Sequence, residues 1–262
     1  MATEQPTGAN ARGHTPVRVA ATGDVHCARE RTKEVEAALA DVSDRADMLL
    51  LAGDLTTHGE PDEAAALAAI CHRLEIPVFA VLGNHDCHAG RPTEVIGRLE
   101  QGGIRVLGGD SATIKVAGQS VGIAGTKGFV GGFAGSSHLS DFGEPALREL
   151  YRLAGCEVEA LDGALREIAL CQIRIVLLHY SPTGDTLVGE PPGIWTFLGT
   201  DRLAAPIVEH EPDLVVHGHA HVGSFEGAVA GVPVYNVSIP VMRRGYHTFE
   251  LSAQERTAAT LR

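Results

Sequence analysis

The first third of the chain alternates short apolar runs with longer stretches in which apolar residues recur at helical spacing. Three apolar runs of strand length are each followed by a segment rich in Ala, Glu and Leu: 17–22 and 29–40, 47–52 and 62–74, and 77–82 and 93–101. Pro61 before the second helix and Gly102 after the third suit the start and the end of a helix. This alternation is typical of βαβ units, so we expect an α/β protein.

The pattern changes after the third predicted helix. Residues 104–124 form short alternating segments around a turn at 117–120, which favours antiparallel strands there. A Gly/Ser-rich stretch, 126–145, predicts a long loop of the kind that is often functional. The remaining expected elements are a helix over 144–170, a strand over 173–178, a loop over 181–199, a helix over 201–210, and strands over 214–216, 224–230, 232–238 and 246–251. With no linker in this pattern, we expect one domain over 17–262, preceded by a flexible arm over 1–16.

Composition narrows the class of protein. The chain carries 33 acidic and 21 basic side chains, and the resulting net charge of −12 makes a nucleic acid polymer an unfavourable partner. Apolar runs such as 48–52 are far shorter than the roughly 20 residues of a membrane-spanning helix, so no membrane partner is expected. The first sixteen residues do not resemble a signal peptide, and the five cysteines show no C-x-x-C spacing. We expect a cytoplasmic protein with reduced thiols, and the sequence specifies no oligomeric state.

Side chains suited to metal binding follow several of the predicted strands. They are Asp24 and His26, then Asp54, then Asn84 with His85 and Asp86, then His179, and finally His219 with His221. Ligand sites in open α/β sheets lie beyond the carboxyl ends of the strands, so residues far apart in the sequence can converge there. Glycine directly precedes a candidate ligand at positions 23, 53, 83 and 218, where it allows a sharp turn. Imidazole, carboxylate and amide donors suit Mn, Fe, Zn, Ni or Co.

Each cluster also has a simpler interpretation when it is taken alone. Asp24 and Asp54 could cap helices, and His179 could be an ordinary core histidine. His219 and His221 could be polar residues at the end of a strand. The metal-site hypothesis rests on the order of all the clusters and on the strand that precedes each one.

The ordered set D-x-H, G-D, G-N-H-D, a single His and G-H-x-H resembles the signature of the calcineurin-like metallophosphoesterases and spans residues 24–221. The resemblance implies a four-layer α/β/β/α sandwich of two mixed sheets. It implies two metal ions bridged by Asp54. The ligands implied for the first ion are Asp24, His26, Asp54 and His221, and those for the second are Asp54, Asn84, His179 and His219.

The resemblance also implies an activity, the hydrolysis of phosphoesters with two divalent ions. Mn, Fe or Zn are expected, with Ni or Co as alternatives. A metal-bridging hydroxide would attack phosphorus in line, and both ions would stabilise charge on the phosphoryl oxygens. His85 would protonate the leaving oxygen or stabilise the transition state, with Asp86 orienting it. A small phosphoester is the expected substrate, because the ions attract phosphate locally despite the acidic surface.

Three functions remain open at this point. Phosphodiester hydrolysis, of a cyclic nucleotide or another small diester, is favoured because the histidine of G-N-H-D is present. A phosphomonoesterase of the same superfamily is the first alternative, since the fold does not determine the substrate. A non-catalytic scaffold is the second, and it would require that the site fail to retain metal. A nuclease is disfavoured by the acidic composition.

Two side chains are candidates for contact with substrate. Lys127, at the start of the 126–145 loop, could bind phosphate, and His58 could line the mouth of the site, although either could be a solvated loop residue. Loop side chains that could contact a base or aryl group, or pack the loops onto the core, are Phe129, Phe133, His138, Trp195 and Phe197. Neighbours of the motifs that we interpret as structural or surface residues are Cys27, Cys87, His88, His217, Arg243 and Arg244.

Overall fold

The first sheet contains the strands predicted by the alternating pattern. The computed structural model describes residues 15–134 and 143–253. In it β1 (Val17–Thr22), β2 (Met48–Ala52), β3 (Val78–Val81) and β4 (Ile104–Val106) run parallel, and β11 (His247–Leu251) pairs antiparallel with β1. The resulting order is β11-β1-β2-β3-β4. The parallel strands all end at the same edge of the sheet.

The second sheet is also mixed and has the order β5-β6-β7-β8-β10-β9. Its strands are β5 (Asp110–Val116), β6 (Gln119–Gly125), β7 (Ile173–Leu177), β8 (Leu214–His217), β9 (Glu226–Val229) and β10 (Val232–Asn236). Ala117 and Gly118 both have positive φ, at 48° and 78°, as the tight turn between β5 and β6 requires. The predicted antiparallel pairing over 104–124 is correct only for this hairpin. β4 runs parallel to β3, and β6 runs parallel to β7.

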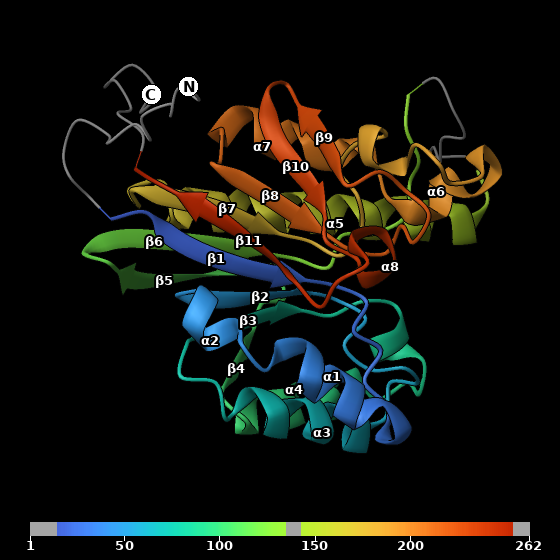
Figure 1. Ribbon diagram of the computed structural model, residues 1–262. Helices are drawn as coiled ribbons and strands as arrows, with labels where there is room; N and C mark the ends of the chain where they lie inside the picture. Colours follow the sequence, from blue (N-terminus) through green and yellow to red (C-terminus); the bar gives the residue numbers. More distant parts are fainter. Residues whose placement is uncertain (1–14, 135–142, 254–262) are drawn as a thin grey trace, which may run out of the picture.

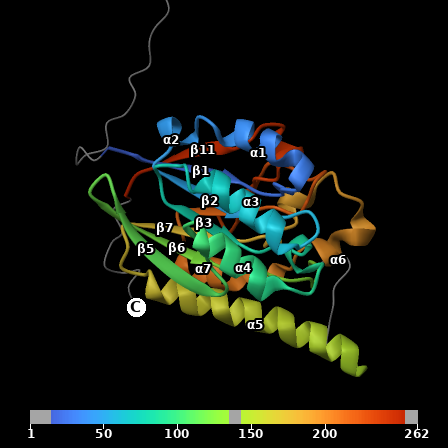
Figure 2. The ribbon, with the colours of Figure 1, turned by 90° about the horizontal axis from the view of Figure 1, so that it is seen from below.

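Helices cover the outer faces of both sheets (Figures 1 and 2). The first sheet is covered by α1 (Thr32–Leu39), α3 (Pro61–Cys71) and α4 (Pro92–Gln101), and the second by α5 (Pro145–Glu167) and α7 (Ala204–His210). The four-layer α/β/β/α sandwich of two mixed sheets is therefore confirmed. Pro61 and Pro92 each open their helix, where the missing N–H is no loss. Among the described residues, no helix is both long and apolar enough to span a membrane.

Several segments form short helices where the sequence predicts a loop or part of a longer helix. The predicted 29–40 helix is divided into η1 (Arg29–Arg31) and α1, and α2 (Val42–Arg45) follows. The predicted 181–199 loop contains η3 (Asp185–Leu187), η4 (Pro192–Ile194) and α6 (Trp195–Leu198). Further short helices are η2 (His85–Cys87), η5 (Asp201–Leu203) and α8 (Ile239–Met242). Most of the expected arm, and residues 135–142 of the expected 126–145 loop, lie outside the described residues.

Alternation along the strands builds the main core. Odd-numbered residues of β1, such as Val17 and Val19, face the second sheet, whereas Ala20 packs toward the helices. β2 is buried on both faces: Leu50 lies between the sheets and Leu49 lies under the helices. A strand buried on both faces reads as a continuous apolar run, as the sequence shows for β2. The resulting two-sided core holds the carboxyl ends of the strands in fixed positions.

Replacing Leu50 by alanine tests the importance of the core between the sheets. Leu50 is fully buried, so we expect Leu50→Ala to lower the free energy of unfolding by about 2 to 5 kcal/mol through lost burial and a residual cavity. Urea denaturation followed by circular dichroism measures this change. Leu170→Ala is the matched control, because Leu170 is 85% exposed and its loss is expected to change stability by less than about 0.5 kcal/mol. Equal effects in the two variants would contradict the packing described here.

Candidate metal centre

The candidate ligands lie in the turns that follow parallel strands of both sheets. Asp24, Asp54 and Asn84 follow β1, β2 and β3 of the first sheet. His179 follows β7, and His219 follows β8, in the second. The candidate ligands from both sheets therefore lie at one shared edge of the sandwich.

Several of these turns are strained. Asp24, His26, Asp54 and His219 have φ angles of 57°, 45°, 49° and 70°, in the left-handed region that favours glycine. Such conformations cost non-glycine residues roughly 1 to 3 kcal/mol each and persist only where the surrounding structure enforces them. Strained residues of this kind concentrate at functional sites. Their presence at four candidate ligands supports a functional role for this edge.

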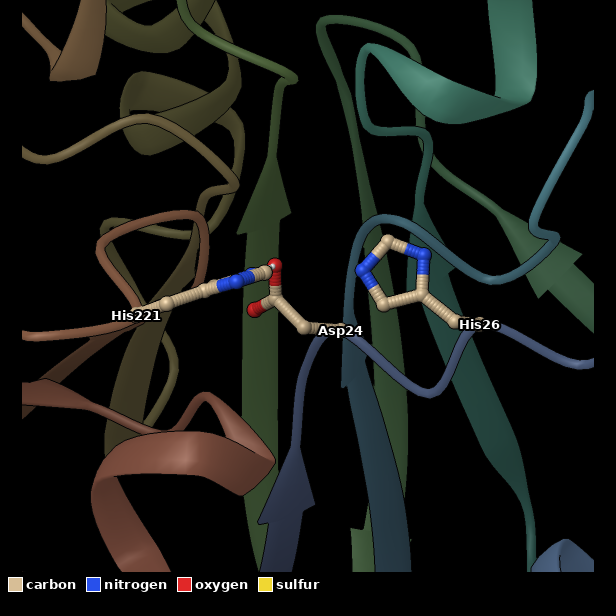
Figure 3. Close-up of side chains that lie close together, drawn as sticks. All are labelled: Asp24, His26 and His221. Atoms are coloured by element: carbon tan, nitrogen blue, oxygen red, sulfur yellow. Dashed lines mark hydrogen bonds and ion pairs between the residues drawn. The ribbon is translucent and has the colours of Figure 1, made fainter.

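The first group of ligand atoms belongs to Asp24, His26 and His221. One ligand atom from each lies within 4.8 Å of the others. The Oδ1 atom of Asp24 is 2.8 Å from Nε2 of His221, and the backbone N–H of His219 donates to Oδ2 of Asp24 at 2.9 Å. Figure 3 shows the Asp24 carboxylate lying against the His221 ring, with the His26 ring on its other side. These three residues converge as the D-x-H and G-H-x-H motifs predicted.

The second group consists of Asp54, His179 and His219, again within 4.8 Å of one another. Nε2 of His179 is 3.4 Å from Oδ1 of Asp54 and 3.0 Å from Oδ1 of Asn84. Asp54 also forms a group with His26 and His85, and its Oδ2 is 3.9 Å from Nε2 of His26. Asp54 therefore shares one group with His26 and His85 and another with His179 and His219.

Burial sets the charge state of these groups. Burial lowers the pKa of His179 and of His219 to about 3, so both imidazoles are neutral and keep a lone pair for a metal ion. Burial also lowers the pKa of His26 and raises that of Asp24, whereas the hydrogen bond that the His221 ring donates to Asp24 raises the pKa of His221. Two buried carboxylates, Asp24 and Asp54, close to one another need compensating positive charge. Divalent ions with nitrogen and oxygen ligands fit this donor set.

Glycine is required beside the ligands for steric reasons. A Cβ atom at Gly83 would collide with the Asp54 carboxylate, and one at Gly53 would collide with the ring of His179. Gly53 also has a φ of 80°. The glycines that the sequence places before the candidate ligands therefore let backbone and ligand side chains approach closely, as expected.

His85 and Asp86 lie at the site, but they do not form the pair expected from the sequence. Nδ1 of His85 is 2.9 Å from the carbonyl oxygen of Thr57, and its Nε2 is 4.0 Å from Oδ2 of Asp54. The buried Asp86 carboxylate instead accepts hydrogen bonds from the Leu55 and Thr56 backbone, the Thr56 hydroxyl and the Gly83 backbone. Asp86 therefore holds the turns after β2 and β3 together, and Thr57 orients His85. Burial raises the pKa of Asp86 to about 6.

Backbone carbonyls fix the orientation of two further histidines, and the sequence could not have identified these partners. Nδ1 of His179 is 2.9 Å from the carbonyl oxygen of Ala52, and Nε2 of His219 is 2.9 Å from that of Phe197. The other ring nitrogen of His179, Nε2, then faces Asp54 and Asn84. Any residue type supplies a carbonyl, so no sequence signal marks these positions. His217 is fully buried and contacts Thr186 Oγ1 at 2.8 Å, which fits its interpretation as a packing residue.

The candidate substrate residues lie in different environments. Nζ of Lys127 is 4.6 Å from the centre of the Phe129 ring and 5.1 Å from that of Tyr180, and burial lowers its pKa. His58 is exposed and pairs with Glu63, with 2.7 Å between Nδ1 and Oε1. The His58 side chain thus pairs with Glu63 and belongs to none of the ligand groups found among the described residues.

Some of the loop aromatics and motif cysteines are packed in the interior, and others are exposed. Trp195 packs against Phe133, whereas Phe197 is 59% exposed. His138 lies outside the described residues. Cys27 is buried and Cys87 is exposed, and neither belongs to a ligand group within the described ranges.

Comparisons with known proteins bear on the family and the fold of this chain. The family model described as calcineurin-like phosphoesterase matches residues 17–223. A search of curated proteins finds no match. Among solved structures, phosphopantetheinyl hydrolase (PptH) from Mycobacterium tuberculosis is similar with a TM-score of 0.68 and 15% identity, over 94% of this chain and 99% of that one.

Two further structures share the fold at low identity. The protein TT1561 from Thermus thermophilus has a TM-score of 0.54 and 19% identity, over 91% of this chain and 100% of that one. GAP50, described as the anchor in the inner membrane complex of Plasmodium, has a TM-score of 0.52 and 12% identity, over 86% of this chain and 72% of that one. At these identities the likeness supports the fold alone.

Gly83→Ala tests whether the close approach of backbone to Asp54 is needed for metal binding. The added methyl group displaces the Asp54 carboxylate, so we expect the affinity for Mn²⁺ to fall by at least about 10- to 100-fold. Isothermal titration of chelator-stripped protein measures this affinity. Gly97→Ala is the control, since a Cβ at this position in α4 meets no neighbour within 4 Å. Unchanged affinity in Gly83→Ala would argue against Asp54 as a ligand.

Proposed function

The chain belongs to the calcineurin-like phosphoesterase family, and from this premise we propose that it hydrolyses small phosphodiesters at the centre described above. Membership of the family makes the chain a metal-dependent phosphoester hydrolase. The observation that carries the proposal is the convergence of two ligand groups around Asp54, with His85 beside them. A phosphomonoester remains the alternative substrate.

We assign the ligands as two overlapping sets. Asp24, His26, Asp54 and His221 hold one ion, and Asp54, Asn84, His179 and His219 hold the other, an assignment supported by the two ligand groups and by the Asn84 contact. Mn, Fe or Zn suit these donors, with Ni or Co as alternatives. When bound, the ions supply a nucleophile at neutral pH and stabilise charge on the phosphoryl oxygens.

His85 is proposed as the residue that handles the proton of the leaving group. The Thr57 carbonyl can only accept a hydrogen bond, so Nδ1 of His85 carries a proton and Nε2 is the nitrogen that exchanges one. Nε2 is also the atom on the Asp54 side of the ring. From that position Nε2 can donate a proton to the departing alkoxide of a diester. Asp86 acts through the turns that it joins, as a positioning residue.

The substrate is proposed to be small. Tyr180 contacts both the Lys127 ammonium and the His219 ring, which supports Lys127 as a residue of the substrate side of the centre. The acidic net charge of −12 disfavours a polymeric polyanion. The five cysteines are free thiols, which supports a reducing, cytoplasmic location.

The choice between diester and monoester is tested directly by two chromogenic substrates. We expect chelator-stripped protein to be inactive and added Mn²⁺ to restore cleavage of bis(p-nitrophenyl) phosphate well above that of p-nitrophenyl phosphate. The reason is that the ions provide the nucleophile while His85 serves the leaving group. A preference for p-nitrophenyl phosphate would replace the proposal by a phosphomonoesterase. Inactivity with Mn²⁺, Fe²⁺, Zn²⁺, Ni²⁺ and Co²⁺ would favour a scaffold.

Two substitutions separate proton transfer from metal binding. We expect His85→Ala to retain metal and to lose about 10²- to 10⁴-fold in kcat, as is typical for loss of a general acid. Asp54→Asn is expected to lose both metal and activity, because the bridging charge is removed. Metal content by atomic emission and turnover of the diester measure both effects. His72→Ala, at an exposed position after α3, is the control. Full turnover in His85→Ala would remove its assignment.

A further inference from the structure

A pocket outside the metal centre lies between α1, α8 and the segment that leads into β11. Its volume of about 280 Å³ is close to the lower end of the range for small-molecule sites. Val25, Val35 and Ile239 contribute apolar lining. Gly245 lies so close to α1 that a Cβ atom there would collide with the carbonyl of Ala38. The helix and this segment therefore bound the pocket as neighbouring walls.

Thr22 gives this pocket a buried polar group that lacks a partner. It lines the pocket, it is fully buried, and its Oγ1 has no hydrogen-bond partner among the residues that the structure describes. Side chains two positions apart on a strand share a face, so Thr22 lies on the same face of β1 as Ala20. Ala20 belongs to the core cluster that contains Val35 and Leu39 of α1. The Thr22 hydroxyl is thus on the α1 side, where the pocket is, and a buried unpaired hydroxyl is unfavourable.

The same pocket carries an excess of positive charge in an acidic protein. Arg31, Arg243 and Arg244 line it together with one carboxylate, that of Glu34. Arg31 donates to Glu34 at 3.2 Å, and Arg244 contacts His247. Within residues 15–134 and 143–253, the exposed guanidinium of Arg243 has no hydrogen-bond or ion-pair partner. A free guanidinium beside an apolar surface is suited to a carboxylate or a phosphate.

Arg243 is held at the pocket by the geometry of the chain. It follows α8 with a φ of 53°, and its backbone N–H donates to the carbonyl of Ile239 at 2.8 Å. The left-handed conformation ends α8 and turns the chain toward Gly245.

The other side of the pocket adjoins the metal centre, because Val25 lies between two candidate ligands in the sequence and Arg31 donates to the His26 carbonyl at 3.3 Å.

We propose that this pocket binds a small amphipathic anion, an apolar molecule with a carboxylate or phosphate at one end and a hydrogen-bonding oxygen at the other. The anionic group pairs with Arg243, the apolar body lies against Val25, Val35 and Ile239, and the oxygen bonds to Thr22. This site is distinct from the substrate centre, and its occupancy does not depend on bound metal.

Three matched probes test the proposal on the metal-free full-length chain. They are 3-(4-hydroxyphenyl)propanoate, 3-phenylpropanoate, which lacks the hydroxyl, and 3-(4-hydroxyphenyl)propan-1-ol, which lacks the carboxylate. Titration by NMR is expected to show saturable binding of the first probe and about tenfold weaker binding of the other two, as loss of one hydrogen bond or one charged contact implies. Removing the metal ions prevents the probes from binding to the metal centre instead.

Two substitutions assign the contacts. Arg243→Met is expected to weaken the binding of both acids by about tenfold and to leave the binding of the alcohol unchanged, because only the acids pair with the guanidinium. Thr22→Val removes the hydroxyl at nearly constant volume, so it is expected to abolish the preference for 3-(4-hydroxyphenyl)propanoate over 3-phenylpropanoate. Arg98→Met, at an exposed position on α4, is the control and is expected to bind all three probes as the wild type does.

Several outcomes would overturn the proposal. These are no saturable binding of any probe, equal binding of the acids by wild type and Arg243→Met, or binding of the alcohol as tight as that of 3-(4-hydroxyphenyl)propanoate. A thermal melt of each variant establishes that it is folded before titration. Since no metal is present, failure here leaves the proposed phosphodiesterase activity untouched.

Discussion

The architecture of the centre follows from one constraint, the confinement of two carboxylates, Asp24 and Asp54, in a buried space shared with several imidazoles. Burying carboxylates without compensating charge is strongly unfavourable. His221 compensates Asp24 in part, through a contact of 2.8 Å that raises the pKa of the imidazole. His179 and His219 supply no charge, because burial keeps them neutral. Divalent cations would supply the remaining compensation, and each neutral imidazole keeps a lone pair with which to bind them.

Such a concentration of acidic groups has to be held in place by the rest of the molecule. The two sheets share a continuous apolar core, and the parallel strands of both sheets end at one edge. This framework enforces left-handed φ angles at Asp24, His26, Asp54 and His219 that short loops would not maintain alone. Asp86 adds a second restraint by joining the turns after β2 and β3 through four hydrogen bonds. The stability of the core and the geometry of the centre are therefore connected through the strand ends.

The sequence predicted the parts of this structure that depend on local pattern. The apolar runs located strands such as β1 and β2, and β2, which is buried on both faces, is apolar at every position. The motifs predicted which aspartate and histidine side chains would lie together. What they could not provide were partners that leave no signal in residue type, such as the carbonyls of Thr57, Ala52 and Phe197. The expected contact of Asp86 with His85 was wrong because a buried carboxylate takes whichever donors surround it, and the adjoining turns supply backbone N–H groups and the Thr56 hydroxyl.

The distribution of charge argues for a substrate that is small and not polymeric. A net charge of −12 acts over the whole surface, but in physiological salt its effect on another ion is largely screened beyond about 8 Å. Divalent ions held at the candidate centre would act on a phosphate at contact distance, where screening is weak. A small phosphoester therefore experiences mainly the attraction of the centre, whereas a long polyanion must also lie along the acidic surface and experiences its repulsion at every further phosphate. The acidic surface therefore disfavours a long polyanion more than a small phosphoester.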